Sequence, residues 1–132
     1  MKKYTWISIG FILFLLGIVY LANTGSDLLR IFYGIPNFDK VGHFTLFGIL
    51  AFFVNKAMSC KKTEVLGNVV LTGSLWIIVF VGLEELSQIF IATRNFDVSD
   101  LMYDLVGIYL GGFIAVATSR PLPSWKIFER VY

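Results

Sequence analysis

The chain has 132 residues and a net charge of +2, with 57% hydrophobic and 15% charged residues, and its mean hydropathy is +0.77. Soluble domains carry about a quarter charged residues, so the composition excludes an ordinary water-soluble domain and favours one integral membrane domain over residues 1–132. The small net charge, without a basic stripe, argues against a nucleic-acid partner. Cys60 is the only cysteine, which excludes an intrachain disulfide.

Four apolar stretches are long enough to cross a bilayer, because a spanning helix needs about 20 residues for a hydrocarbon core of about 30 Å. In chain order they cover about residues 4–22, 41–58, 65–91 and 98–119. The first follows Met1-Lys2-Lys3, but it is longer than the apolar core of a usual signal peptide and no small-residue cleavage site closes it. The sequence therefore predicts an all-α bundle of four transmembrane helices in which the first helix is retained.

The connection between the first two predicted helices, from Asn23 to Asp39, has two interpretations. Asp27 is placed to cap a short apolar turn that Gly34 and Pro36 would end, and such a segment would lie in the membrane interface. An ordinary loop fits equally well. After Arg120 the sequence indicates a short interfacial tail.

Lys and Arg fall unevenly on the two ends of this predicted bundle. If the N-terminus is cytoplasmic, eight of the 11 basic residues lie in cytoplasmic segments, and Arg30, Lys40 and Arg94 face outward. Cytoplasmic loops carry the excess of Lys and Arg, so we expect both termini in the cytoplasm. The start of the second helix, the end of the third and the start of the fourth then share the outer face of the membrane.

The second predicted helix starts with Asp39, Lys40 and His43. Asp39 and His43 are four residues apart, so the carboxylate can meet the imidazole one turn away and fix its tautomer. His43 is a candidate acid, base or ligand, although a structural hydrogen-bonding histidine fits the same position. Lys40 is a candidate for holding an anionic group or for reaching lipid headgroups.

The third predicted helix ends with Glu84, Glu85 and Gln88. Adjacent helical residues point about 100° apart, so we expect one glutamate to face inward and the other to face water. A carboxylate beside apolar turns is costly to ionise unless a cation compensates. A carboxylate whose ionisation is costly in this way suits a general acid or base. The same position also suits a structural ion pair, for which Arg94 in the following loop is a candidate partner.

Three aspartates precede or begin the fourth predicted helix. Asp97 and Asp100 have the spacing of a helix N-cap and its first-turn acid, and capping alone accounts for both. Asp104 lies one turn deeper, on a stripe that continues through Gly107 and Gly111. The small residues favour close helix packing, and an acid on that packed face is a functional candidate.

These residues resemble, in order and spacing, the VanZ-like family of small bacterial membrane proteins. The set that carries the resemblance is Asp39-Lys40-x-x-His43-Phe44-x-x-Phe47-Gly48-x-Leu50, then Glu85-x-x-Gln88-x-Phe90, Arg94, Asp97, Asp100, Asp104, Gly107 and Gly111. The family often has Asn where this chain has Asp104, and the residue before the Glu varies, so Glu85 gains more support than Glu84. The resemblance implies a cell-envelope role in the bacterial cytoplasmic membrane. The name-giving member is associated with low-level resistance to the glycopeptide teicoplanin.

Two functions fit this set of residues. The first is an enzyme acting at the outer face on a lipid-linked or anionic envelope substrate. Its candidate catalytic residues are His43, Glu85, Asp39 and Asp104, and its candidate substrate-binding residues are Lys40, Gln88, Arg94, Asp97 and Asp100. A divalent cation fits there too, since carboxylates suit Mg²⁺ or Ca²⁺ and an added imidazole suits Zn²⁺; the sequence leaves the cofactor open. The second function is non-catalytic: capture of a lipid headgroup or lipoglycopeptide, or modulation of an envelope partner within the bilayer.

Overall fold

A computed structural model describes residues 2–25, 35–92 and 96–119. Within these residues the chain forms four helices and one β-hairpin. The helices are α1 (Lys2–Asn23), α3 (Phe38–Ala57), α4 (Thr72–Gln88) and α5 (Val98–Ala117), and the hairpin strands are β1 (Lys62–Val65) and β2 (Asn68–Leu71). The predicted interfacial turn at residues 27–33 and the tail after Ser119 lie outside the described residues.

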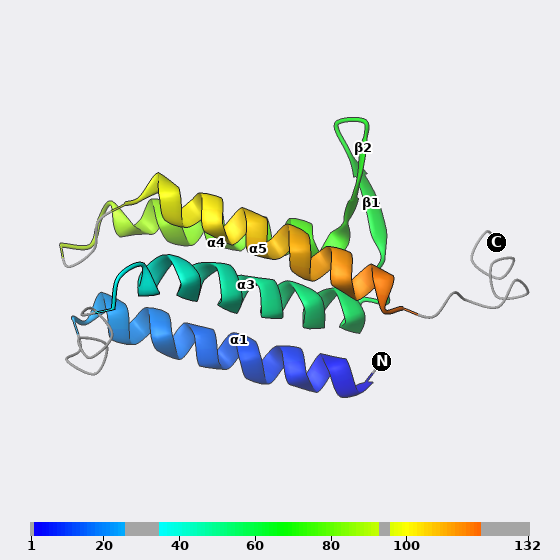
Figure 1. Cartoon of the computed structure of the whole chain (residues 1–132), viewed down its shortest axis with the longest axis horizontal. Helices are drawn as coiled ribbons and strands as arrows, with labels where there is room; N and C mark the ends of the chain where they lie inside the picture. The colour runs from blue at the N-terminus through cyan, green and yellow to red at the C-terminus, as the bar shows by residue number, and fades with distance from the viewer. Residues whose placement is uncertain (1, 26–34, 93–95, 120–132) are drawn as a thin grey trace, which may run out of the picture.

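Helix α3 is central, because it contacts each of the other three described helices. Helix α1 lies along one side of α3, and α4 and α5 lie along the other (Figure 1). The start of α1 and the hairpin lie at one end of the bundle, and the start of α3, the end of α4 and the start of α5 lie at the opposite end (Figure 1). The shared position of the α3 start, the α4 end and the α5 start agrees with the common face expected from the sequence.

The hairpin is the main difference from the predicted elements. We expected a helix over residues 65–91, but the first part of that range pairs with β1 in the register Lys62↔Leu71 and Val65↔Asn68, and the helix occupies only Thr72–Gln88. The predicted start is therefore wrong. Leu66 and Gly67 both have positive φ, 51° and 78°, which is the backbone of a tight two-residue hairpin turn.

Two of the described helices, α1 and α5, are long and apolar enough to cross a membrane. Helix α4 has 17 residues, and α3 has charged residues near both ends. Large apolar side chains such as Trp6 and Tyr109, each 72% exposed, point away from the bundle, as expected for a surface that contacts lipid. The mostly helical architecture is confirmed, while four membrane crossings and the orientation of the termini stay predictions.

The backbones of α3 and α5 touch through glycines. A Cβ atom on Gly111 would collide with the backbone carbonyl of Gly48, and one on Gly107 would collide with the carbonyl of Phe44. The stripe of small residues that the sequence placed on one face of α5 is buried along its length, through to Ala115. Small side chains let helices approach closely and gain van der Waals contact, so this stripe brings α5 against α3.

The glycine contact predicts a specific loss of stability. Gly111→Ala places a methyl group against the Gly48 backbone and should destabilise the purified protein by about 1–3 kcal/mol, the usual cost of overpacking. Thermal unfolding in detergent measures the effect. Gly82→Ala is the matched control, since a Cβ at Gly82 has no atom within 4 Å; equal losses in both variants would contradict this account.

Candidate functional site

Polar side chains converge at the end of the bundle where α3 and α5 start and α4 ends. His43 lies five residues into α3, Asp104 six residues into α5, and Glu85 three residues before the end of α4. At 1.5 Å per residue these depths are roughly 5–9 Å below the bundle end, so the three side chains lie at similar levels. We call the following residues the polar cluster: Asp39, Lys40, His43, Glu84, Glu85, Gln88, Asp97, Ser99, Asp100 and Asp104.

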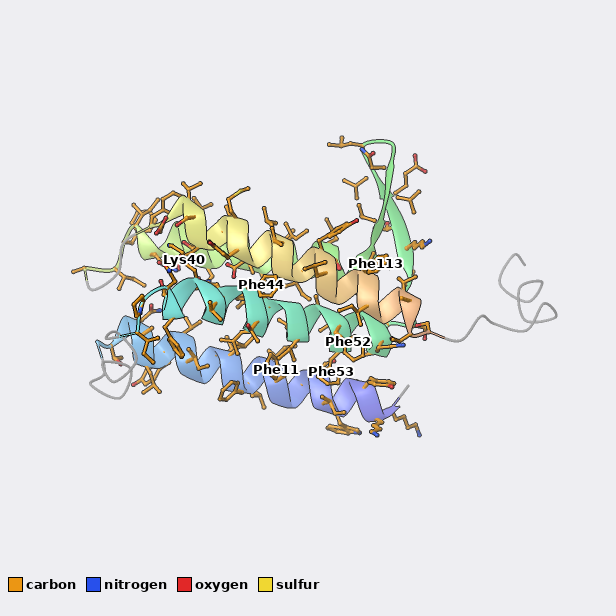
Figure 2. All side chains as sticks on the ribbon, in the orientation of Figure 1. Phe11, Lys40, Phe44, Phe52, Phe53 and Phe113 are labelled. Carbon is orange, nitrogen blue, oxygen red and sulfur yellow. The ribbon has the colours of Figure 1, made fainter. Side chains whose placement is uncertain are left out.

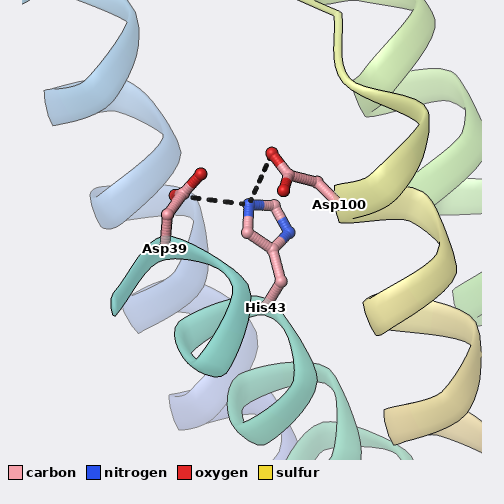
Figure 3. A group of neighbouring side chains, drawn as sticks. All are labelled: Asp39, His43 and Asp100. Atoms are coloured by element: carbon pink, nitrogen blue, oxygen red, sulfur yellow. Dashed lines mark ion pairs between the residues drawn. The ribbon is translucent and has the colours of Figure 1, made fainter. Parts of the chain in front are cut away.

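The centre of the polar cluster is the pair formed by His43 and Asp104. His43 Nδ1 lies 2.9 Å from Asp104 Oδ1 and 3.2 Å from Oδ2, and Asp104 is fully buried. The opposite ring nitrogen, Nε2, faces Asp39 Oδ1 at 3.8 Å and Asp100 Oδ2 at 3.9 Å (Figure 3). We expected Asp39 to orient His43, but Asp104 from α5 makes the closer contact.

Glu85 is the inward-facing member of the glutamate pair on α4. It is 1% exposed and Gln88 is 2% exposed. The Gln88 amide bridges the pair, because Nε2 donates to Glu85 Oε1 at 3.1 Å and to Glu84 Oε2 at 3.0 Å. Glu85 Oε2 is buried with no hydrogen-bond partner among the described residues. Such an atom costs free energy unless a ligand, a proton or water satisfies it.

Lys40 lies at the rim of the polar cluster, where Figure 2 labels it at the start of α3. Its Nζ donates to Ser99 Oγ at 2.7 Å and to Asp97 Oδ2 and Asp100 Oδ1 at 3.2 Å each. These bonds use all three donors of an ammonium group. The carboxylates of Asp97 and Asp100 therefore already offset the charge of Lys40, the residue that we expected to bind a substrate.

Asp97 caps α5, as its position in the sequence predicts. Its Oδ1 accepts hydrogen bonds from the Ser99 hydroxyl at 2.7 Å and from the Ser99 backbone N–H at 2.8 Å. These bonds, together with the bond from Lys40, hold the pKa of the Asp97 carboxyl below its usual range. Sequence reasoning did not single out Ser99; its signal was a hydroxyl residue two positions after a capping aspartate.

Carboxylates outnumber cationic groups in the polar cluster. Two sets of three residues offer ligand atoms that all lie within 4.8 Å of one another: Asp39, His43 and Asp100; and His43, Glu85 and Asp104. The candidate residue Arg94 lies outside the described residues. All the other candidate site residues meet in this cluster, where a histidine paired with a buried carboxylate is suited to proton transfer or to holding a cation.

An apolar groove runs between α3 and α5 away from the polar cluster. Its volume is about 600 Å³, and its lining includes Phe44, Gly48, Phe52, Gly107, Leu110 and Ile114. Lys40, Phe44 and Phe52 follow one another along α3 in Figure 2. Among the lining residues, Phe44 directly follows His43 in sequence and Gly107 lies three residues after Asp104, so this end of the groove is the one nearer the polar cluster along both helices.

The chain matches the VanZ/LLP1 family model over residues 3–119. It therefore belongs to the VanZ/LLP1 family. Comparisons with curated proteins and with solved structures give no match. The matched range contains every candidate site residue.

The capping geometry predicts how stability depends on pH. Because the pKa of Asp97 is lower in the folded protein than its usual value of 3.8, the charge of Asp97 stabilises the fold above about pH 4, and this contribution is lost as pH falls through the lowered pKa. Asp97→Asn keeps a capping oxygen but removes the charge. We expect it to lower the Tm at pH 7, with a gap from wild type that narrows below pH 4; a gap independent of pH would contradict this account.

Proposed function

We propose that this member of the VanZ/LLP1 family is a multi-pass protein of the bacterial cytoplasmic membrane that acts on a lipid-linked envelope substrate. Its polar cluster would lie at the extracytoplasmic face and receive the substrate's headgroup. The observation that carries this proposal is the position of the apolar groove, whose lining begins with Phe44 and Gly107, just after His43 and Asp104 along α3 and α5. The polar cluster would suit the headgroup of a lipid, and the apolar groove would suit its hydrocarbon chain.

The groove fits one hydrocarbon chain of such a substrate. Its volume of about 600 Å³ falls within the roughly 300–1,000 Å³ of small-molecule sites. The side chains of Phe44, Phe52 and Leu110 offer only apolar contact to its contents, while Gly48 and Gly107 form part of its floor. A chain that lies there would keep the attached headgroup at the end of the bundle, next to His43.

His43, Asp104 and Glu85 would supply the chemistry. Asp104 holds one nitrogen of the imidazole, so the other nitrogen is the one available to exchange a proton with a substrate. Glu85 Oε2 is buried and has no hydrogen-bond partner in the part of the chain that the structure describes, and Glu85 would act as the second acid or base. Simple capture of a headgroup needs neither a buried histidine–carboxylate pair nor an unpaired buried carboxylate, so the site favours catalysis over non-catalytic capture.

Altered resistance to teicoplanin is the cellular outcome we propose, and it provides the functional test. In cells whose teicoplanin resistance depends on this chain, His43→Asn and Glu85→Gln should abolish the resistance at unchanged protein level, because each removes a proton-transfer group while conserving shape. Glu64→Gln, on the exposed hairpin strand β1, is the control. Minimum inhibitory concentrations measure the effect.

Retained resistance in these variants separates the two functions. Full resistance in both His43→Asn and Glu85→Gln would reject the catalytic role. If the same two variants keep resistance while Arg94→Ala loses it, the chain captures its ligand without chemistry.

The proposed orientation predicts which residues reagents reach from outside the cell. In a Cys60→Ser background, a cysteine at Phe96, which is 40% exposed next to the polar cluster, should react with a membrane-impermeant maleimide in intact cells. A cysteine at Asn68 in the hairpin should react only after permeabilisation, because the hairpin lies at the opposite end (Figure 1). Labelling in the reverse pattern would place the polar cluster in the cytoplasm and reject an extracytoplasmic site.

A further inference from the structure

We propose that His43, Glu85 and Asp104 bind a first-row divalent cation of the Zn²⁺ type at the centre of the polar cluster. The three residues come from α3, α4 and α5, and one ligand atom from each lies within 4.8 Å of the others. The inference rests on the proposed function only for the role of the cation. Binding itself follows from the geometry.

The distances suit a shared ion. Ligand atoms bound to one Zn²⁺ at about 2.1 Å in tetrahedral geometry lie about 3.4 Å apart. His43 Nδ1 and Asp104 Oδ1 are 2.9 Å apart, so small side-chain rotations bring all three residues to an ion. Three protein ligands leave a fourth position for water or a substrate oxygen, as in catalytic zinc sites.

The unpaired oxygen of Glu85 points to a ligand independently of this spacing. Glu85 is 1% exposed, its Oε1 is held by Gln88, and its Oε2 has no hydrogen-bond partner among the described residues. A buried carboxylate with one oxygen fixed by an amide and the other unpaired is typical of a metal ligand with a supporting hydrogen bond.

The other nitrogen of His43 also fits ligation. When Nδ1 binds the ion, Nε2 carries the proton and faces Asp39 and Asp100 at 3.8 and 3.9 Å (Figure 3). Carboxylates in this position orient a ligating histidine and strengthen its donor nitrogen. Asp39 and Asp100 would thereby support the metal site that His43 forms with Glu85 and Asp104.

The charge balance favours a cation at this point. Glu85 and Asp104 are almost fully buried, and the one described lysine of the polar cluster is engaged by Asp97 and Asp100. His43 is the other described group in the polar cluster that can carry positive charge, and it faces Asp104, Asp39 and Asp100. Carboxylates therefore outnumber the groups that can compensate them, which is unfavourable for the buried ones. A divalent cation balances the charge of both carboxylates, and its open coordination position would accept an oxygen atom of an anionic headgroup.

Metal binding by the purified full-length chain tests the inference without any substrate. The protein, carrying a tag without histidines, is stripped with a chelator and titrated with Zn²⁺ and with Co²⁺, whose visible absorption reports coordination. We expect one ion per chain, with Zn²⁺ bound far more tightly than Mg²⁺. Glu85→Gln and His43→Asn should each weaken Zn²⁺ at least tenfold, and Gln88→Leu should weaken it about 10–100-fold as a supporting residue.

Two further variants serve as controls. Glu64→Gln on the hairpin should bind like wild type. His43→Cys in a Cys60→Ser background should retain Co²⁺ and add a thiolate charge-transfer band, which shows ligation by residue 43 even if other variants fold poorly. Absence of Zn²⁺ and Co²⁺ binding by the wild-type chain, or unchanged affinity in folded Glu85→Gln and His43→Asn, would overturn the inference. Either result leaves the teicoplanin test of the proposed function unaffected.

Discussion

The direct backbone contact between α3 and α5 is the constraint on which the site depends. Packed helices usually lie 8–10 Å apart, and the glycines at positions 48, 107 and 111 allow a closer approach because no Cβ atom separates the backbones. His43 lies five residues before Gly48 and Asp104 three residues before Gly107, so their 2.9 Å interaction depends on this contact. A larger side chain at the crossing would therefore alter the site without touching it. The same contact forms part of the groove floor, so helix packing and the proposed lipid site have one structural origin.

The electrostatics of the polar cluster divide into two parts. At the rim, Lys40, Asp97 and Asp100 form ion pairs beside the start of α5, with 28%, 47% and 9% of their side chains exposed. Helix capping and ion pairing alone therefore explain why these three residues are present at the rim. Deeper in the bundle, Asp104 contacts His43 and Glu85 accepts a hydrogen bond from Gln88, in surroundings where charge is poorly solvated. The rim residues therefore have a structural explanation, and the interior residues are the ones to which we assign the proposed chemistry.

Intrahelical spacing predicted much of this architecture, and contacts between helices were harder to predict. The cap at Asp97 and the buried stripe through Gly107 and Gly111 follow from local rules, and the structure contains both. The pairing of His43 with Asp104 depends on how α3 and α5 are aligned, which a single helix does not encode; spacing suggested Asp39 instead. The hairpin was missed because Val69, Val70 and Leu71 of its second strand lead into α4 within one uncharged stretch that runs to Leu83. Gly67 was the local signal of the turn.

The depth of the site connects its geometry with a membrane substrate. The ionisable residues of the interior lie within about 9 Å of the bundle end by helical rise, while the buried core between α1, α3, α4 and α5 is formed by residues such as Leu50, Ile77, Val81 and Ile108. In the membrane orientation that we propose, that depth would lie beneath the headgroups, and the groove would extend from there into the hydrocarbon. A lipid-linked substrate would thus reach His43 and Glu85 with its chain still in an apolar environment. Because such a lipid would stay in the membrane, little free energy would be spent on moving its chain through water.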